Sequence, residues 1–396
     1  MSKPLKYGTV WLLLAAWLTM NAVLLSGCWD RNEIEETGIV LGIGLDMPSD
    51  GGDDEQRRPK ISMTHQIALP TGFSEQGGGK TQKKYMNITS EGPIIFDNIR
   101  QLATRIDRPP SYEHVRVIVI GEQVARQMDL RNVINFFMRN TETRRSIRVV
   151  VAKGRSEPIF SQHKSGQTPA IELREMTENY HKTLRTPVQM TLGNLSEHLT
   201  GQHSFVLQRV MALREESQLS GAAVVKGATA RMVGWLGELE TAGLNCLLGI
   251  RRFNGVIEGV ELESGAMLGY EVRRMKRHIV PIIEGDRISF EVRIKSEGKL
   301  REDWANPGDS FDQAFVERAE QATAARIRQL AERALEKTQK QYKVDVVGFG
   351  KRLSIDHPAV WRRVKDDWED RFSRMPVKVK VEVRIQEFGT RGSKRR

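Results

Sequence analysis

The residue with the clearest chemical role is Cys28, which follows Leu25, Ser26 and Gly27. A leucine, two small residues and a cysteine form the pattern of a bacterial lipobox, in which the thiol receives a diacylglyceryl group and the preceding segment is cut off. Small residues let the peptidase approach the backbone, and a thiolate is nucleophilic enough to accept the lipid. The sequence therefore predicts lipidation of Cys28, with S-diacylglycerol on the sulfur and an N-acyl group on the new terminus.

The segment before Cys28 has the layout of a secretory signal. Lys3 and Lys6 form a short cationic head, and Thr9 to Leu25 is almost wholly apolar. A permanent membrane helix is the alternative, but crossing ~30 Å of hydrocarbon takes roughly 20 apolar residues, so this stretch is marginal. The lipobox directly behind it favours a lipoprotein signal peptide over residues 1–27. The rest of the chain is then expected to be lipid-anchored on the outer face of the cell membrane.

The other candidates for chemistry are weaker. Cys246 has no partner thiol once Cys28 carries lipid, and two leucines follow it, so a buried and inert thiol is predicted. His198 and His203 are five positions apart and do not share a helix face, which argues against a metal site. The run Phe136-Phe137-Met138 is more typical of a core than of a partner surface.

A glycine-rich stretch, Gly77-Gly78-Gly79-Lys80, has only part of a phosphate-binding loop. That motif needs a glycine six positions before the lysine, where this chain has Ser74. The sequence also has no Gly-x-Ser-x-Gly nucleophile elbow. We therefore predict a protein that is not an enzyme, with no catalytic residue, no metal and no cofactor.

The formal charge of +11 falls to +9 without the signal, because Lys3 and Lys6 leave and no acid leaves with them. An exported lipoprotein rarely meets nucleic acid, so nucleic acid is not predicted as a partner. The densest basic run extends from Arg273 to Arg277. Such a run is usually a solvated face, and the alternative is attraction to anionic head groups, on the order of 1 kcal/mol per well-placed side chain.

Hydrophobic periodicity predicts an α+β fold of two or three domains, each a mostly antiparallel or mixed β-sheet with helices packed around it. The predicted strands are 38–46, 61–69, 115–120, 147–152, 206–213, 222–226, 229–236, 256–262, 267–272, 278–283, 287–295 and 377–385. The predicted helices are 93–106, 122–127, 130–138, 170–184, 238–248 and a long one over 310–342. The polar stretch Thr186 to Gly201 is the predicted domain boundary. Before it lies an N-terminal region, residues 28–195, for which a division into two subdomains stays open. After it lies a C-terminal α+β domain, residues 205–390.

Three groups of residues have a recognisable order along the chain. The first group is Cys28-Trp29-Asp30-Arg31 with Glu33 to Glu36 and Gly38 to Asp46. The second group runs from Phe96-Asp97-Asn98-Ile99-Arg100 through His114, Val117 to Glu122, Ala125-Arg126, Phe136 to Arg139 and Arg144. The third group comprises Gly221 to Lys226, Val233 to Leu236, Glu240-Thr241, the long helix, Asp345, Gly348, Gly350 and Trp361. Together they resemble the Ger(x)C family, the C-subunit lipoproteins of spore germinant receptors, over nearly the whole mature chain. The departures from the family pattern are Arg108-Pro109-Pro110-Ser111 and the glycine-rich loop.

The resemblance implies a lipoprotein on the outer surface of the spore inner membrane, needed for germination in response to nutrients. Its implied partners are two membrane-embedded receptor subunits, of the A and B types, and membrane lipid through Cys28. The family has no known catalytic residues, and Cys28 alone carries over with a defined role. Two other classes stay open from the residues alone: a solute-binding lipoprotein of a transporter, built from two lobes of parallel βαβ units, and a lipid-anchored hydrolase.

Overall fold

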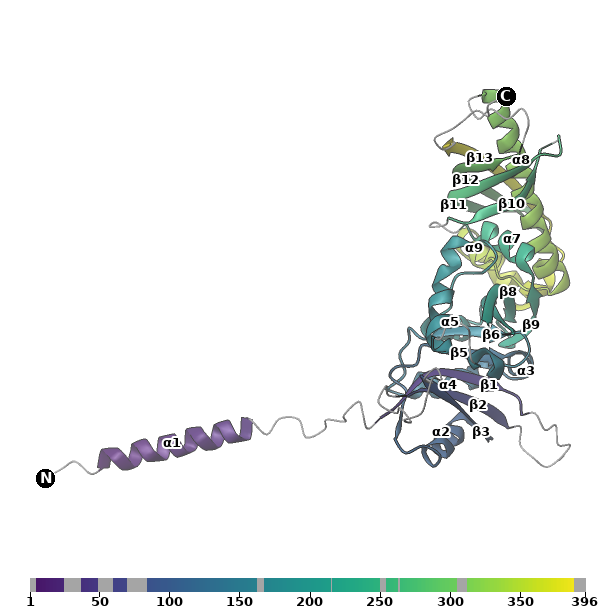
Figure 1. The fold of residues 1–396 in the computed structure, drawn as a ribbon. Helices are drawn as coiled ribbons and strands as arrows, with labels where there is room; N and C mark the ends of the chain where they lie inside the picture. Colours follow the sequence, from purple (N-terminus) through teal and green to yellow (C-terminus); the bar gives the residue numbers. More distant parts are fainter. Residues whose placement is uncertain are drawn as a thin grey trace, which may run out of the picture.

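The computed structural model describes residues 5–24, 37–48, 60–69, 84–161, 167–214, 216–249, 254–262, 264–304 and 312–387. The lipobox at 25–28 and the glycine-rich loop at 77–80 lie outside these residues. Two mixed β-sheets with helices packed on them form the body (Figure 1), so the α+β prediction is confirmed. The first sheet lies toward the lower end of Figure 1, and the second lies toward its upper end.

The apolar segment near the start forms helix α1 (Leu5–Leu24). Its large side chains have little cover, and Trp11, for example, is 72% exposed. No helix within the described residues is long and apolar enough to cross a membrane.

The first sheet has nine strands in the part of the chain that the structure describes. Eight follow the order β3 (Tyr85–Gly92), β2 (Ile61–Ala68), β1 (Gly38–Asp46), β5 (Val117–Gly121), β6 (Arg148–Ala152), β7 (Phe205–Leu213), β8 (Glu216–Lys226) and β9 (Arg231–Leu236), and β4 (Pro110–Ser111) pairs with the start of β1. The central strands β1, β5, β6 and β7 are parallel, whereas both ends of the sheet are antiparallel. Strand β2, predicted at residues 61–69, pairs with β1 in the antiparallel direction.

Helices cover both faces of this sheet, which explains its nearly continuous apolar strands. Ile118 and Ile120 face one core, and Val117 and Val119 face the other. The first core lies under α2 (Ile95–Ala103), α3 (Glu122–Gln127), α4 (Leu130–Arg139) and α6 (Leu192–Thr200); the second lies under α5 (Pro169–Glu178) and the 3₁₀ turn η2 (Glu157–Phe160), and η3 (Asn179–Lys182) follows α5. Helix α6 occupies the stretch that the sequence suggested as a polar boundary.

Strands β7, β8 and β9 extend the first sheet although they come after that boundary. Strand β6 pairs with β7 in parallel through Val151 and Arg209, and through Ala152 and Val210. The first sheet thus takes strands from both sides of the boundary, and the division into residues 28–195 and 205–390 remains a prediction.

The second sheet has the order β10 (Val256–Glu261), β11 (Met267–Glu284), β12 (Arg287–Asp303) and β13 (Val377–Glu387). Strands β11 and β12 form one long hairpin, and Gly285 supplies the left-handed turn with φ +61°. The separate strands predicted at 267–272 and 278–283 are wrong in one respect, because Arg273 to Arg277 continues β11 across a bulge. Strand β13 pairs with β12 in parallel.

The helices of the second half are α7 (Glu238–Leu248), α8 (Gln313–Leu335), α9 (Phe349–Asp356), α10 (Pro358–Val364) and α11 (Trp368–Phe372), with a 3₁₀ turn η5 (Lys365–Asp367). The helix predicted over 310–342 begins at Gln313 and changes at Glu336 into a π-helical turn, η4 (Glu336–Gln341). Ala222 and Val224 of β8 belong to the same apolar cluster as Ile327 and Leu330 of α8. The two sheets therefore share a hydrophobic core.

Candidate functional site

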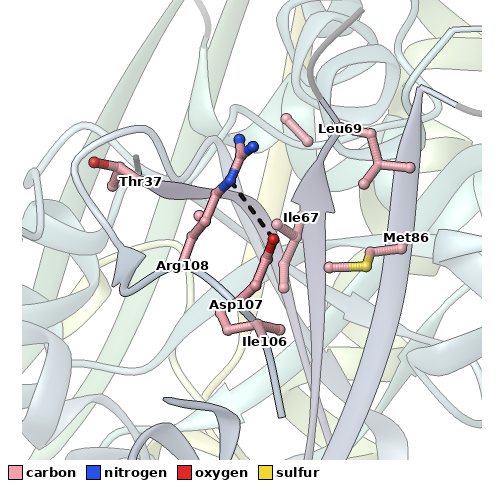
Figure 2. Close-up of a pocket in the computed structure, with 9 residues that line it drawn as sticks. Thr37, Ile67, Leu69, Met86, Ile106, Asp107 and Arg108 are labelled. Atoms are coloured by element: carbon pink, nitrogen blue, oxygen red, sulfur yellow. Dashed lines mark ion pairs between the residues drawn. The ribbon is translucent and has the colours of Figure 1, made fainter. Parts of the chain in front are cut away.

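A pocket lies where the N-terminal segment joins the body. The start of β1, the end of β2, the start of β3 and the loop after α2 enclose about 180 Å³ (Figure 2). Its wall is mostly apolar, with Ile67, Leu69, Met86 and Ile106 among the lining side chains. We call this cavity the β1 pocket.

Two charged side chains, Asp107 and Arg108, lie at the β1 pocket and are drawn joined by a dashed line in Figure 2. Arg108 Nε is 3.9 Å from Asp107 Oδ2. The Gly38 amide donates to the Pro109 carbonyl at 2.9 Å, which fixes this loop against β1. The stretch Arg108-Pro109-Pro110-Ser111, where the sequence departs from the Ger(x)C pattern, therefore lies at the pocket and supplies β4.

The β1 pocket lies at the end of the body to which the predicted lipid anchor would connect. Cys28 precedes Thr37, a lining residue, by nine positions. A chain of that length spans at most about 30 Å. The geometry can hold a small apolar group beside a charged pair, and it offers no set of groups arranged for bond cleavage.

The sequence-predicted site residues do not converge on a reactive centre. Cys28 lies outside the described residues. Cys246 is buried, as predicted, and its burial raises the pKa of the thiol to about 12, which disfavours the reactive thiolate. Within the described ranges, no three His, Cys, Asp or Glu side chains are grouped so that they could hold a metal ion.

His198 lies in the last turn of α6, and His203 follows the helix at an exposed position. The ring of His198 packs against Phe205, with 5.2 Å between the ring centroids. Burial lowers the pKa of His198, and the positive charges of His203 and Lys351 lower it further. The run Phe136-Phe137-Met138 belongs to the first core, where Phe137 is 2% exposed, so the prediction of a core role is confirmed.

Sequence reasoning missed two carboxylates that fix chain segments. Asp46, at the end of β1, accepts hydrogen bonds from the Ser156 amide and hydroxyl, both at 2.8 Å, and from the Glu157 amide at 3.1 Å. Asp345 accepts from backbone amides at the start of α9. The signal for the second was present, since glycines at 348 and 350 follow the aspartate closely.

Polar contacts also join the two halves of the chain. Glu369, in the first turn of α11, accepts a hydrogen bond from Ser204 Oγ at 2.8 Å. Lys226 Nζ lies 2.8 Å from the other carboxylate oxygen of Glu369. Tyr342, after η4, donates its hydroxyl to the Trp235 carbonyl of β9 at 2.8 Å. These contacts hold the turns of the first sheet against the helices of the second half.

A solved structure aligns with this two-sheet architecture over nearly the whole chain. The crystal structure of the GerBC protein aligns with a TM-score of 0.59 at 23% identity, over 90% of this chain and 99% of that chain. The protein is thus a two-sheet α+β protein with the GerBC fold.

The family follows from the sequence comparisons. The family described as "Spore germination protein N-terminal domain" matches residues 30–211, and "Spore germination B3/GerAC like, C-terminal" matches residues 220–389. The chain belongs to this GerAC/GerBC-like family of spore germination protein C subunits, which are not known enzymes.

Relatives in Bacillus subtilis (strain 168) match over nearly their whole length. Spore germination protein YndF is 32% identical over 93% of this chain and 94% of its own. Spore germination protein A3 is 32% identical over 94% and 96%, and spore germination protein B3 is 27% identical over 93% and 96%.

Proposed function

We propose that this protein is the lipid-anchored, non-catalytic subunit of a nutrient germinant receptor. In this role it is required for spore germination in response to nutrients and acts with two membrane-embedded subunits, of the A and B types. Its anchor is the lipid on Cys28, and its place is the outer face of the spore inner membrane. Its mechanism is presentation, because tethering keeps a large folded body at high effective concentration beside the membrane subunits.

The observation that carries the proposal is the extent of the family match. The two matched regions run from residue 30 to residue 389 with a gap of only a few residues, and the first begins two positions after Cys28. The exposed apolar side chains of α1 support the anchor, because an apolar helix without cover is typical of a signal peptide that enters the membrane and is then cut off. Two or three acyl chains on one cysteine hold a soluble body at a membrane, whereas one chain binds only weakly.

The solute-binding alternative receives less support. It requires two lobes of parallel βαβ units. The second sheet is instead built on a long antiparallel hairpin, with one parallel strand, β13, at its edge.

The test is germination of spores from which this chain has been deleted, complemented with the wild type, with Cys28→Ala or with Cys246→Ala. Spores are given nutrient mixtures and, separately, a trigger that bypasses receptors. We expect the deletion and Cys28→Ala to lose the response to some nutrients while the bypass stays intact. Cys246→Ala, which also removes a thiol, should restore the response. Full nutrient responses in the Cys28→Ala strain, with the variant recovered in the membrane fraction, would contradict the lipid anchor.

A further inference from the structure

A second cavity lies between β11 and α9 and encloses about 240 Å³. A liquid water takes about 30 Å³, so the cavity has room for a small hydrated ion. Four of its lining residues are basic: Arg277 and His278 from β11, and Lys351 and Arg352 from α9. None of its lining residues is acidic. We call this cavity the α9 pocket.

Two acids close in sequence to the lining residues, Asp345 and Asp356, already have partners. Asp345 accepts hydrogen bonds from the amides of Gly348, Phe349 and Gly350 at 2.7 to 3.0 Å and from Trp368 Nε1 at 3.2 Å. Asp356 pairs with Arg352, with 2.7 Å between Oδ2 and Nε. Among the described residues, no carboxylate forms an ion pair with Lys351. Asp356 therefore balances Arg352, and the net positive charge of the cavity comes from Arg277 and Lys351.

Arg277 is held in place rather than free to swing into solvent. Its guanidinium donates to the Val347 carbonyl at 3.2 Å. Its stem passes Gly249, the left-handed cap of α7, so closely that a Cβ there would lie 2.6 Å from Arg277 Cγ. Burial lowers the pKa of Arg277, while Asp345 acts in the opposite direction. A cation that is fixed and partly desolvated attracts an anion more strongly than a solvated one does.

Lys351 also lies close enough to α6 to act on His198. After burial, the charges of His203 and Lys351 are the main influences that lower the pKa of His198, and Glu197 opposes them. Lys351 therefore adjoins both the cavity and α6, and α9 packs on β11.

We propose that the α9 pocket binds a phosphate-type oxyanion, either free phosphate or the head group of an anionic phospholipid. Lys351 supplies a mobile point charge, and the guanidinium group of Arg277 supplies planar donors that match phosphate oxygens. Arg352 contributes only the donors that its pair with Asp356 leaves over. Gly348 also lines the cavity, and the nearest atom to a Cβ added there would be Lys351 Cβ at 4.0 Å, so the space beside it is open. The α9 amides do not contribute to binding, because Asp345 already occupies them.

The test uses the full chain purified in a neutral detergent and titrated calorimetrically with three probes. These are inorganic phosphate and two soluble short-chain lipids, dihexanoyl phosphatidylglycerol and dihexanoyl phosphatidylcholine. We expect saturable binding of phosphate or of the glycerol lipid, weakened about tenfold or more by Lys351→Glu, which replaces an attraction with a repulsion. Arg328→Glu makes the same charge change on the exposed face of α8 and should leave binding unchanged.

The probes distinguish the two sources. Binding of inorganic phosphate supports a free anion, and binding of the anionic lipid alone supports a head group. No binding of either, equal weakening by Lys351→Glu and Arg328→Glu, or equal binding of both lipids would overturn the proposal. Lys351 is exposed, so unchanged thermal unfolding of Lys351→Glu serves as the check on its fold.

Discussion

At the scale of single residues, Asp345 determines how α9 begins. Helix α9 starts from Gly348, which has φ +92°, and it lacks a capping side chain of its own at that position. Asp345 reaches forward and accepts hydrogen bonds from three successive amides and from the Trp368 indole. One carboxylate thus satisfies donors that would otherwise be left unpaired at a helix start.

Replacing Asp345 should measurably destabilise the protein. Asp345→Ala leaves those donors without an acceptor, and we expect the free energy of unfolding to fall by about 2 kcal/mol. Chemical denaturation of the full chain measures the change. Asp366→Asn, an exposed acid in the neighbouring turn, is the matched control and should stay within about 0.5 kcal/mol of the wild type. Equal stability of the two variants would mean that Asp345 is not the cap.

His65 gives the protein a pH dependence. Its ring lies in the first sheet, fully buried, with Nε2 3.2 Å from the Tyr112 hydroxyl. Burial lowers the pKa of His65 from 6.5 to about 4. Because the folded pKa is the lower one, the unfolded chain takes up the proton first. The contribution of neutral His65 to the free energy of unfolding is therefore fully present above pH 6.5. It is lost as the pH falls toward 4, by about 3 kcal/mol in all.

The pH prediction can be tested with His65→Gln, which keeps a polar group near Tyr112 but cannot take up this proton. We expect its free energy of unfolding to change less than that of the wild type between pH 6.5 and pH 4. His278→Gln, at an exposed position on β11, is the control and should keep the wild-type slope. Parallel pH profiles for the wild type and His65→Gln would show that His65 does not cause the loss.

At the scale of elements, α7 and α8 approach so closely that only glycine fits between them. A Cβ on Gly243 would lie 1.8 Å from the Leu330 carbonyl oxygen, which is backbone and cannot turn aside. Alanine usually stabilises a helix by about 1 kcal/mol relative to glycine. At this position the clash should outweigh that gain, because the two helices would have to separate.

We therefore expect Gly243→Ala to lower the free energy of unfolding by about 3 kcal/mol, within the range for overpacked cores. The matched control is Gly193→Ala in α6, where the nearest atom to an added Cβ is Nε of the flexible Arg145 side chain at 3.1 Å. That control should change stability by less than about 1 kcal/mol. Thermal and denaturant unfolding of both variants measure the difference. A gain in stability for Gly243→Ala would show that α7 and α8 have room to spare.

The sequence predicted most elements because their residues repeat with clear periods. The alternation of valine with charged residues in β13 and the apolar run of β5 are examples. Helix α6 was missed because Pro187 and Gly193 made its surroundings look like a linker. The break predicted within β11 came from Arg273 to Arg277, whose charges are compatible with a strand that has one face in solvent.

Pairing partners and pockets were much less accessible to the sequence than the elements. Strand β13 pairs with β12, although about 70 residues separate them, and a local pattern carries no information on such a contact. For the same reason the two pockets were not predicted, because each is lined by residues that are far apart in the sequence. The α9 pocket brings together Arg277 and Lys351, and the β1 pocket brings together Ile67 and Ile106. Lipidation of Cys28, in contrast, is predicted from a short sequence motif alone and needs no knowledge of the fold.

At the scale of the whole molecule, the two sheets share one apolar cluster as well as polar links. Leu236 of β9 and Leu330 of α8 belong to that cluster. The polar links include the Tyr342 hydroxyl on the Trp235 carbonyl, and Glu369 with Ser204 and Lys226. A hydrogen bond contributes about 1 kcal/mol net, whereas each buried large aliphatic side chain contributes about 2 kcal/mol. The apolar contact should therefore dominate the coupling between the sheets.

This ranking predicts how the molecule unfolds. A chain of this length can unfold sheet by sheet, but a shared core makes either sheet unstable without the other. We expect denaturant-dependent hydrogen exchange to give one midpoint for peptides of β5 and β6 and for peptides of β11 and β12. The double variant Tyr342→Phe, Glu369→Ala removes the links made by these two side chains and should lower that midpoint by the equivalent of about 2 kcal/mol without splitting it. Two separate midpoints in the wild type would mean that the sheets are independent domains. A split that appears only in the double variant would mean that the polar links, and not the apolar cluster, join them.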